Sequence, residues 1–303
     1  MHTALDCMPC FTRQALEALR CAGTAEAAQR EVMRHVLRAL AAEVDLGSSP
    51  PEIAQRVHRL VRRLTGDGDP YASLKARANA IALAAEPQLR ASVDAAPDRF
   101  AAATRLAIAA NALDAGIGTS AAVGGGHGQG RGENRGAADR LVRALRGGLE
   151  EPLHGDLDEF RGAVARAERI LYLTDNSGEI VVDGLLVEQL PRDRVVVAVR
   201  GAPVLNDATR ADARSAGLDA LVSVMENGSD APGTVLSDCS PEFKRVFGAA
   251  DVIVAKGQGN YESLSDVDAP VFFLFKVKCP LAARHAGLPL GAHALLRPAG
   301  ARA

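Results

Sequence analysis

The segment Arg169–Thr174 reads RILYLT, and the polar segment Asp175-Asn176-Ser177-Gly178-Glu179 follows it directly. A short apolar and β-branched run of this kind is typical of a buried parallel strand. Similar runs follow at 194–200 (RVVVAVR), 221–225 (LVSVM), 251–255 (DVIVA) and 271–275 (VFFLF). Segments with helical spacing alternate with them, near 180–190, 208–216, 241–248, 261–265 and 281–286. This alternation predicts an α/β fold with a doubly wound, mainly parallel sheet in a Rossmann-like three-layer arrangement.

The first part of the chain has a different pattern. Apolar residues recur at three-and-four spacing in Phe11–Cys21, Ala25–Val44, Ile53–Leu64 and Arg99–Leu113, which indicates amphipathic helices. We therefore expect an α-helical bundle or cap domain over 1–150 and an α/β catalytic domain over 151–303. Seven glycines lie in the stretch 124–136, which is predicted to be a mobile loop that proteases cleave first.

The composition limits the classes of function. The 303 residues are 48% hydrophobic and 24% charged, which is ordinary for a globular protein and excludes global disorder. A net charge of −2, an aromatic content of 4% and the absence of Trp argue against nucleic acid as a partner. No run reaches the roughly 18 apolar residues of a membrane span, and the first residues do not resemble a signal peptide. We expect a cytoplasmic protein that binds neither nucleic acid nor membranes; the sequence does not indicate its oligomeric state.

Polar residues follow every predicted strand. Because the carboxyl ends of parallel strands lie at one edge of the sheet, these residues should converge there. Asp175, Asn176 and Asp207 carry oxygen atoms that suit a hard divalent cation such as Mg²⁺ or Mn²⁺. The sequence therefore predicts a metal site at the ends of the first two strands.

A phosphate-binding pattern follows the last two strands. Lys256 and either Lys276 or Lys278 are point charges that suit a phosphate group. The turn Gly257–Gly259 lets backbone N–H groups approach an anion at the start of a helix. A cation together with these groups indicates phosphate-ester hydrolysis by a metal-activated water, with direct attack by Asp175 as the alternative.

Structural roles for some of these residues remain open. Asn176 and Glu179 have the spacing of a capping box, and Asp207 could be an N-cap. Asp69 with Pro70 is a common helix start. Polar residues nevertheless follow all five predicted strands, and this common feature favours a functional site.

At these residues the sequence resembles the metal-dependent damage-control phosphatase family, and the resemblance runs along most of the chain. Its cysteines point to the cysteine-bearing, mainly prokaryotic subgroup, whereas the glycine-rich stretch departs from the family pattern. The motifs that carry the resemblance are Asp6-Cys7-Met8-Pro9-Cys10, Asp69-Pro70-Tyr71 with Lys75 and Asn79, Ala110-Asn111-Ala112-Leu113-Asp114, Asp175–Glu179, Pro203–Thr209, Lys256–Glu262 and Lys276–Pro280.

The resemblance implies roles for residues at the strand ends and on the helices. It implies that Asp175, Asn176 and Asp207 hold the metal. Lys256, expected from its place after a strand to contact phosphate, completes the predicted catalytic set. It implies that the helical half covers the site and turns Lys75, Asn79, Asn111 and Asp114 toward it. The residues expected to contact substrate are Glu179, Asn206, Gln258, Gly259, Asn260, Tyr261, Glu262 and Lys276.

Cys7-Met8-Pro9-Cys10 has the two-residue spacing of a metal knuckle, and Cys279 could supply a third ligand for a second metal. A redox pair of Cys7 and Cys10, with Cys279 buried and inert, is the alternative. Cys21 and Cys239 are expected to have no role.

We therefore expect a divalent-metal-dependent phosphatase that hydrolyses small phosphorylated metabolites, sugar- or nucleotide-related, or their damaged forms. The metal is left open among Mn²⁺, Mg²⁺, Ni²⁺ and Co²⁺. A methyltransferase on the same fold is less favoured, because Gly178 is the only glycine in the turn after the first strand. A non-catalytic phosphate- or metal-binding protein is the alternative from another class.

Overall fold

The computed structural model describes residues 1–43, 45–111 and 131–298. In this part of the chain, seven strands form one sheet in the order β1-β7-β6-β5-β2-β3-β4. Neighbouring strands are parallel except β6 and β7, which are antiparallel. Their bounds are β1 (Leu153–His154), β2 (Ile170–Leu173), β3 (Val195–Val199), β4 (Ser223–Glu226), β5 (Val252–Lys256), β6 (Val271–Lys276) and β7 (His293–Leu296). The predicted mainly parallel sheet is confirmed, and the predicted runs correspond to β2 through β6.

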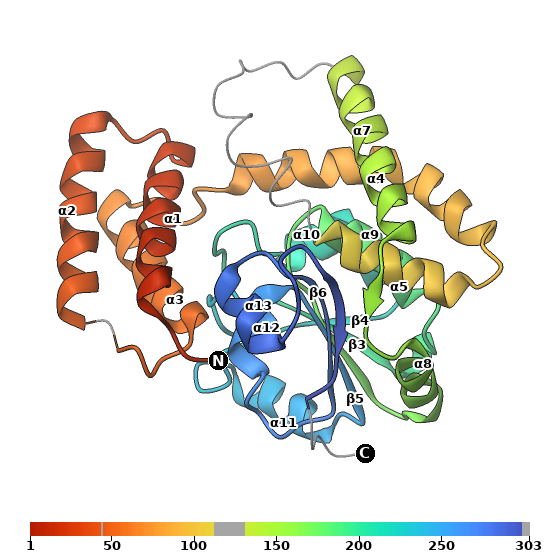
Figure 1. Ribbon diagram of the computed structural model, residues 1–303. Helices are drawn as coiled ribbons and strands as arrows, with labels where there is room; N and C mark the ends of the chain where they lie inside the picture. Colours follow the sequence, from red (N-terminus) through yellow and green to blue (C-terminus); the bar gives the residue numbers. More distant parts are fainter. Residues whose placement is uncertain (44, 112–130, 299–303) are drawn as a thin grey trace.

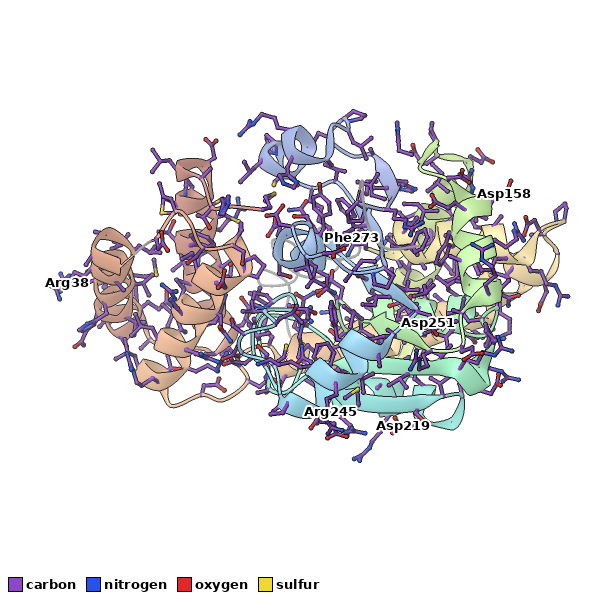
Figure 2. The ribbon with its side chains drawn as sticks, turned by 90° about the horizontal axis from the view of Figure 1, so that it is seen from below. Arg38, Asp158, Asp219, Arg245, Asp251 and Phe273 are labelled. Carbon is purple, nitrogen blue, oxygen red and sulfur yellow. The ribbon has the colours of Figure 1, made fainter. Side chains whose placement is uncertain are left out.

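Helices cover both faces of the sheet (Figure 1). One layer contains α4 (Ala72–Asp94), α5 (Arg99–Ala110), α7 (Arg131–Glu150), α8 (Leu157–Arg166), α9 (Glu179–Val187) and α10 (Arg210–Ser215). The other contains α11 (Pro241–Ala249), α12 (Gln258–Leu264) and α13 (Pro280–Ala286). Ile170 and Tyr172 of β2 belong to the first core, and Leu171 and Leu173 to the second, because successive strand side chains point to opposite faces. Figure 2 shows Phe273 of β6 in the interior, whereas Asp219 points outward at the edge of the molecule. The three-layer arrangement is confirmed.

Three N-terminal helices have a core of their own. They are α1 (Met8–Cys21), α2 (Glu26–Glu43) and α3 (Pro50–Thr65), and they lie side by side at one flank (Figure 1). Helix α3 starts at a capping box between Ser49 and Glu52 and ends at Gly66, whose φ of +72° favours glycine. The helices of the first half therefore form two groups: α1, α2 and α3 pack on one another, whereas α4, α5 and α7 pack on the sheet. No helix in the described part of the chain is long and apolar enough to cross a membrane.

The glycine-rich stretch differs in part from the expectation. Helix α7 begins at Arg131, so residues 131–136 are helical rather than part of a loop. Leu141, Val142 and Leu145 of this helix are buried against α4 and α5, and this burial outweighs the low helix propensity of glycine. Residues 124–130, and with them the predicted protease site, lie outside the described residues.

Helix α4 begins later than Asp69-Pro70 suggested. Its first residue is Ala72, and Asp69 is not its N-cap. Instead, the Asp69 carboxylate accepts the Tyr71 N–H at 3.2 Å and the Lys75 ammonium at 3.0 Å. The turn before α4 therefore ties Lys75 to the chain that leads into its own helix.

Candidate active site

A cavity of about 500 Å³ lies where the carboxyl ends of β2, β3 and β5 meet α1 and α3. It is called the strand-end cavity below. The sequence-predicted residues that line it are Asp175, Asn176, Asn206, Asp207, Gln258, Gly259, Glu262, Lys278, Cys7, Cys10 and Cys279. The expected convergence of polar groups at this edge of the sheet is therefore present, together with a wall from the N-terminal helices.

Backbone hydrogen bonds join the loops after β2 and β3. The Ala208 N–H donates to the Asp175 carbonyl and the Ser177 N–H to the Asn206 carbonyl, both at 2.8 Å. Asn176 and Asp207 face each other in an isolated β-bridge. These bonds hold the three predicted oxygen-donor side chains on one wall of the cavity.

Asp175 is a buried carboxylate held by two amides. Its Oδ2 accepts Asn111 Nδ2 at 2.7 Å and Asn176 Nδ2 at 2.8 Å. A Cβ on Gly257 would overlap this carboxylate, so the glycine after β5 leaves the space that Asp175 occupies. Gly257 has a φ of +82°, which also favours glycine.

Arg200 places a buried positive charge beside the two acids. Its Nε donates to Asp207 Oδ2 at 2.6 Å, and its Nη2 lies 4.0 Å from Asp175 Oδ1. Arg200 was not identified from the sequence, although a charged residue that ends the apolar run of β3 is a usable signal. The guanidinium offsets part of the repulsion between Asp175 and Asp207.

The capping roles considered for Asn176 and Asp207 do not occur. Helix α10 is capped by Thr209 and Asp212, whose side chains form the capping box. Helix α9 follows Gly178, and no side chain caps it. Both capping alternatives are therefore wrong.

Lys256 does not lie on the strand-end cavity, contrary to its expected phosphate contact. Its side chain is fully buried, and Nζ donates to Glu179 Oε1 and Asp183 Oδ1, both at 2.6 Å. Although burial opposes the charge, these carboxylates raise the pKa of Lys256 above its usual value. Burial raises the pKa of Asp183 to about 6, against the attraction of Lys256. The ammonium is thus part of a buried ionic network beneath the cavity, because residue 256 still belongs to β5.

Glu179 also differs from its expected role as a substrate contact. It is fully buried, and its carboxylate accepts amide hydrogens from Asn111 and Asn176, both at 3.1 Å to Oε2. The same two amides donate to Asp175 Oδ2, so Glu179 is linked to Asp175 through Asn111 and Asn176.

Helix α12 presents only part of the predicted substrate segment to the cavity. Gln258 Nε2 donates to Glu262 Oε1 at 2.7 Å, and both side chains line the cavity one helical turn apart. Burial raises the pKa of Glu262 to about 7. Asn260 is fully buried and donates to the carbonyls of Thr174 and Lys256. Its predicted contact is not seen, because it faces the sheet.

Two further predicted substrate contacts are placed elsewhere. The Tyr261 hydroxyl lies 2.7 Å from His285 Nδ1, and its ring stacks on Phe275 with centroids 4.6 Å apart. Lys276 does not line the strand-end cavity, and its N–H donates to Asn111 Oδ1 at 3.2 Å. Lys278, two residues on, lines the cavity instead.

The polar residues of α4 hold the β2–α9 loop. Asn79 Oδ1 accepts the Gly178 N–H at 2.6 Å, and Asn79 Nδ2 donates to Asp212 Oδ1 at 2.8 Å. Lys75 Nζ lies 3.6 Å from Asp212 Oδ2. Asn79 and Asn111 therefore contact the β2–α9 loop from the helical half, whereas Lys75 contacts Asp69 and Asp212, and none of the three lines the cavity. Asp114 lies outside the described residues.

The three cysteines of the predicted second metal site line one cavity, and all are free thiols. Gln258 Nε2 approaches Cys279 Sγ at 3.4 Å, and Arg13 Nη2 approaches Cys10 Sγ at 3.6 Å. Among the residues that the structure describes, no group of three or more His, Cys, Asp or Glu side chains is placed to hold a metal ion. The thiols are thus neighbours without forming a ready ligand cage.

Comparisons with known proteins agree with the sequence resemblance. The sequence model of the damage-control phosphatase ARMT1-like domain matches residues 3–294. A damage-control phosphatase of Archaeoglobus fulgidus is 36% identical over 243 residues, which is 79% of this chain and 79% of that protein. Damage-control phosphatase PH1575 of Pyrococcus horikoshii is 30% identical over 302 residues, 98% of each chain.

The fold agrees as well. A crystal structure of the DUF89 family protein PH1575 from Pyrococcus horikoshii matches with a TM-score of 0.86 and 30% identity, covering 99% of this chain and 100% of that one. Sequence and structure thus agree along nearly the whole length. The chain belongs to the ARMT1-like damage-control phosphatase family.

Proposed function

We propose that this protein is a divalent-metal-dependent phosphatase that acts on small phosphorylated metabolites or their damaged forms. One observation carries the proposal: Asp175, Asn176 and Asp207 share a wall of a cavity of about 500 Å³. That volume suits a small metabolite. The names of the relatives and the family match support a phosphatase reaction.

The donor set fits a hard cation. Two carboxylates and one amide supply oxygen atoms, and the space left by Gly257 allows the Asp175 carboxylate to reach the cavity wall. Such a set does not discriminate strongly among Mn²⁺, Mg²⁺, Ni²⁺ and Co²⁺. When bound, the cation would polarise a phosphoryl oxygen and lower the pKa of water.

The other groups on the cavity wall suit the substrate. Lys278 and Arg284 bring positive charge that can attract a phosphate group. Gln14, Asn206 and Gln258 offer amides that hydrogen-bond hydroxyl groups, as in a sugar phosphate. Asn111 orients Asp175 by donating to its Oδ2. The chain's own residues therefore bind and orient the substrate and hold the carboxylates in place.

Asp207→Asn tests this proposal. The change removes one of two negative charges, and a charge pair at about 4 Å is worth roughly 4 kcal/mol at an effective dielectric of about 20. We expect a loss of activity or metal affinity of about a thousandfold. Hydrolysis of p-nitrophenyl phosphate, then of a panel of phosphorylated metabolites, is measured with each of the four metals and after chelation.

Asp219→Asn is the matched control, because Asp219 is an exposed acid that pairs with Arg214, points outward (Figure 2) and does not line the cavity. Its activity should equal that of the unmodified protein. Since Asp207 also pairs with buried Arg200, circular dichroism and metal titration are measured alongside activity. Near-normal turnover of Asp207→Asn at limiting metal would remove this residue from the site. Binding of metal and phosphate without turnover of any substrate would favour a non-catalytic binding protein.

A further inference from the structure

Cys7 and Cys10 are placed at the start of a helix. Cys7 is the N-cap residue of α1, Cys10 is the third residue of the helix, and Pro9 lies between them. Residues three apart on a helix have Cβ atoms about 5–6 Å apart, whereas a disulfide needs about 3.5–4.5 Å, so a bridge requires a small backbone shift in the first turn of the helix. Both thiols also line the strand-end cavity, so a small reactant that enters the cavity can reach them.

The surroundings of the two thiols differ. Burial raises the pKa of Cys7 and of Cys10, and negative charge on Glu262 and Cys279 acts in the same direction. Cys10 also has donors beside it, since Arg13 Nη2 lies 3.6 Å and Gln14 Nε2 3.7 Å from its Sγ. These donors stabilise a thiolate on Cys10 when it forms, which favours Cys10 as the attacking sulfur.

Cys279 is held differently. Its Sγ accepts the Ala282 N–H at 3.3 Å at the start of α13 and is approached by Gln258 Nε2 at 3.4 Å. These contacts fix its side chain at the start of α13, which packs in the α/β part of the molecule. The pair within Cys7-Met8-Pro9-Cys10 can close within one helix, whereas a bridge to Cys279 would have to link α1 to α13.

We propose that Cys7 and Cys10 form a reversible dithiol–disulfide pair on the wall of the strand-end cavity, with a low-molecular-weight disulfide as the oxidant. The Cys10 thiolate attacks one sulfur of the small disulfide, which releases one small thiol and leaves a mixed disulfide on Cys10. Cys7 loses its proton and attacks the Cys10 sulfur, which releases the second small thiol. Two protein thiols are oxidised and one small disulfide is reduced to two thiols, so atoms and electrons balance.

The pair has a consequence for the cavity. Oxidation replaces two S–H groups on one wall by a bridge and stiffens the first turn of α1. We expect the phosphatase KM to differ between the two states, and this consequence rests on the proposed function. The redox reaction itself does not depend on it.

Thiol counting under redox control tests the proposal. The full chain is equilibrated with mixtures of reduced and oxidised glutathione in the absence of metal. The reaction is stopped with acid, free thiols are alkylated, and the protein mass is measured by mass spectrometry. We expect the number of alkylatable thiols to fall from five to three as the mixture becomes oxidising, with a Cys7–Cys10 link in the peptide map. Cys7→Ser and Cys10→Ser should lose this transition, and Cys7→Ser should stop at a glutathione adduct. Cys21→Ser, at the end of the same helix, should keep it.

Other outcomes overturn the proposal. They are five alkylatable thiols in every mixture, a bridge that includes Cys279, and a stoichiometric metal in the purified chain that Cys7→Ser loses. Activity is measured in both states with the four divalent metals. If the bridge forms but neither state hydrolyses any substrate, the redox pair stands and the proposed function fails.

Discussion

At the scale of single residues, Gly257 and Asp175 depend on each other. Gly257 has no side chain, and the Asp175 carboxylate occupies the space where a Cβ would lie. The backbone at Gly257 also has a positive φ. A side chain here would therefore displace a predicted metal ligand as well as strain the turn before α12.

We expect Gly257→Ala to lower phosphatase activity by at least a hundredfold while the protein stays folded, because the new methyl group pushes Asp175 out of position. Activity against metal concentration and the melting temperature are measured together. Gly248→Ala is the control: Gly248 lies in α11 with open space around it, so alanine should keep activity and add about 0.5–1 kcal/mol of stability. Normal activity of Gly257→Ala would show that the activity does not depend on the present position of the Asp175 carboxylate.

His58 predicts a pH dependence of stability. Burial lowers the pKa of His58 to about 4, and the charge of Arg62 acts in the same direction. The unfolded chain binds a proton at His58 below about pH 6.5, whereas the folded chain does not until about pH 4. The free energy of unfolding should therefore fall as the pH drops through this window.

His58→Leu should flatten this slope, as measured by urea unfolding at several pH values. His35→Gln serves as its control, because His35 is exposed on α2 and should leave the slope unchanged. If the free energy of unfolding changes with pH equally in the unmodified protein and in His58→Leu, groups other than His58 cause the loss of stability in acid.

At the scale of elements, helix α4 supports the β2–α9 loop. Asn79 accepts the N–H of Gly178 and donates to Asp212 of the α10 capping box, so one side chain joins this loop to the start of α10. Asn79→Ala should cost about 1–3 kcal/mol, because a buried N–H and a carboxylate lose partners. We also expect a clear loss of kcat/KM.

The control for Asn79→Ala is Gln88→Ala on the exposed face of the same helix. Melting temperature and phosphatase kinetics are measured for both variants. If Asn79→Ala matches Gln88→Ala in both measurements, α4 does not support the site.

The local pattern predicted some elements better than others. β2, β3, β5 and β6 are short apolar runs that are buried on both faces, so their sequence shows them directly. Among the described strands, β1 and β7 were not predicted. β1 has only two residues, and the antiparallel pairing of β7 with β6 cannot be inferred from the sequence of β7 alone. Whether such a segment becomes a strand, and in which direction it runs, thus depends on its pairing with other segments of the chain.

The directions of side chains were harder to predict than their places in the chain. Asp175 and Lys256 both lie near strand ends, yet one lines the cavity and the other is buried beneath it. Gln258 and Glu262 share one face of α12, and Asn260 points to the opposite side. The direction depends on the loop conformation and on the buried acids Glu179 and Asp183, which sequence spacing alone does not show.

At the scale of the whole molecule, ion pairs fasten the N-terminal helices to the α/β part. Arg59 Nη2 lies 3.0 Å from Asp238 Oδ2, and both Arg59 and Arg62 pair with Asp230. Although burial opposes it, Arg59 lowers the pKa of Asp230. Because α3 supplies Pro50, Pro51 and Ala54 to the cavity, these pairs hold one wall against the other.

The double variant Arg59→Ala with Arg62→Ala should raise KM about tenfold or more with a smaller change in kcat, because the wall of α3 loosens while the oxygen donors stay on the sheet. A change of about 1.4 kcal/mol in docking is enough for a tenfold effect. Steady-state kinetics at low and high salt measure it. Arg63→Ala, exposed on the same helix, should change neither constant. A fall in kcat alone would contradict a role for this interface in substrate binding.

The position of β2 between β3 and β5 has a consequence for how the chain is made. β2, β3 and β4 leave the ribosome before β5, which follows only after α11. Until then, one edge of β2 has no partner strand, and all four of its side chains are of the kind that the finished protein buries. Such an edge is open to pairing with another nascent chain. The β2–α9 loop with Asp175 leaves the ribosome early, but Gly257, which leaves space for the Asp175 carboxylate, follows only after β5. A stalled or truncated chain is therefore open to aggregation before the strand-end cavity can form.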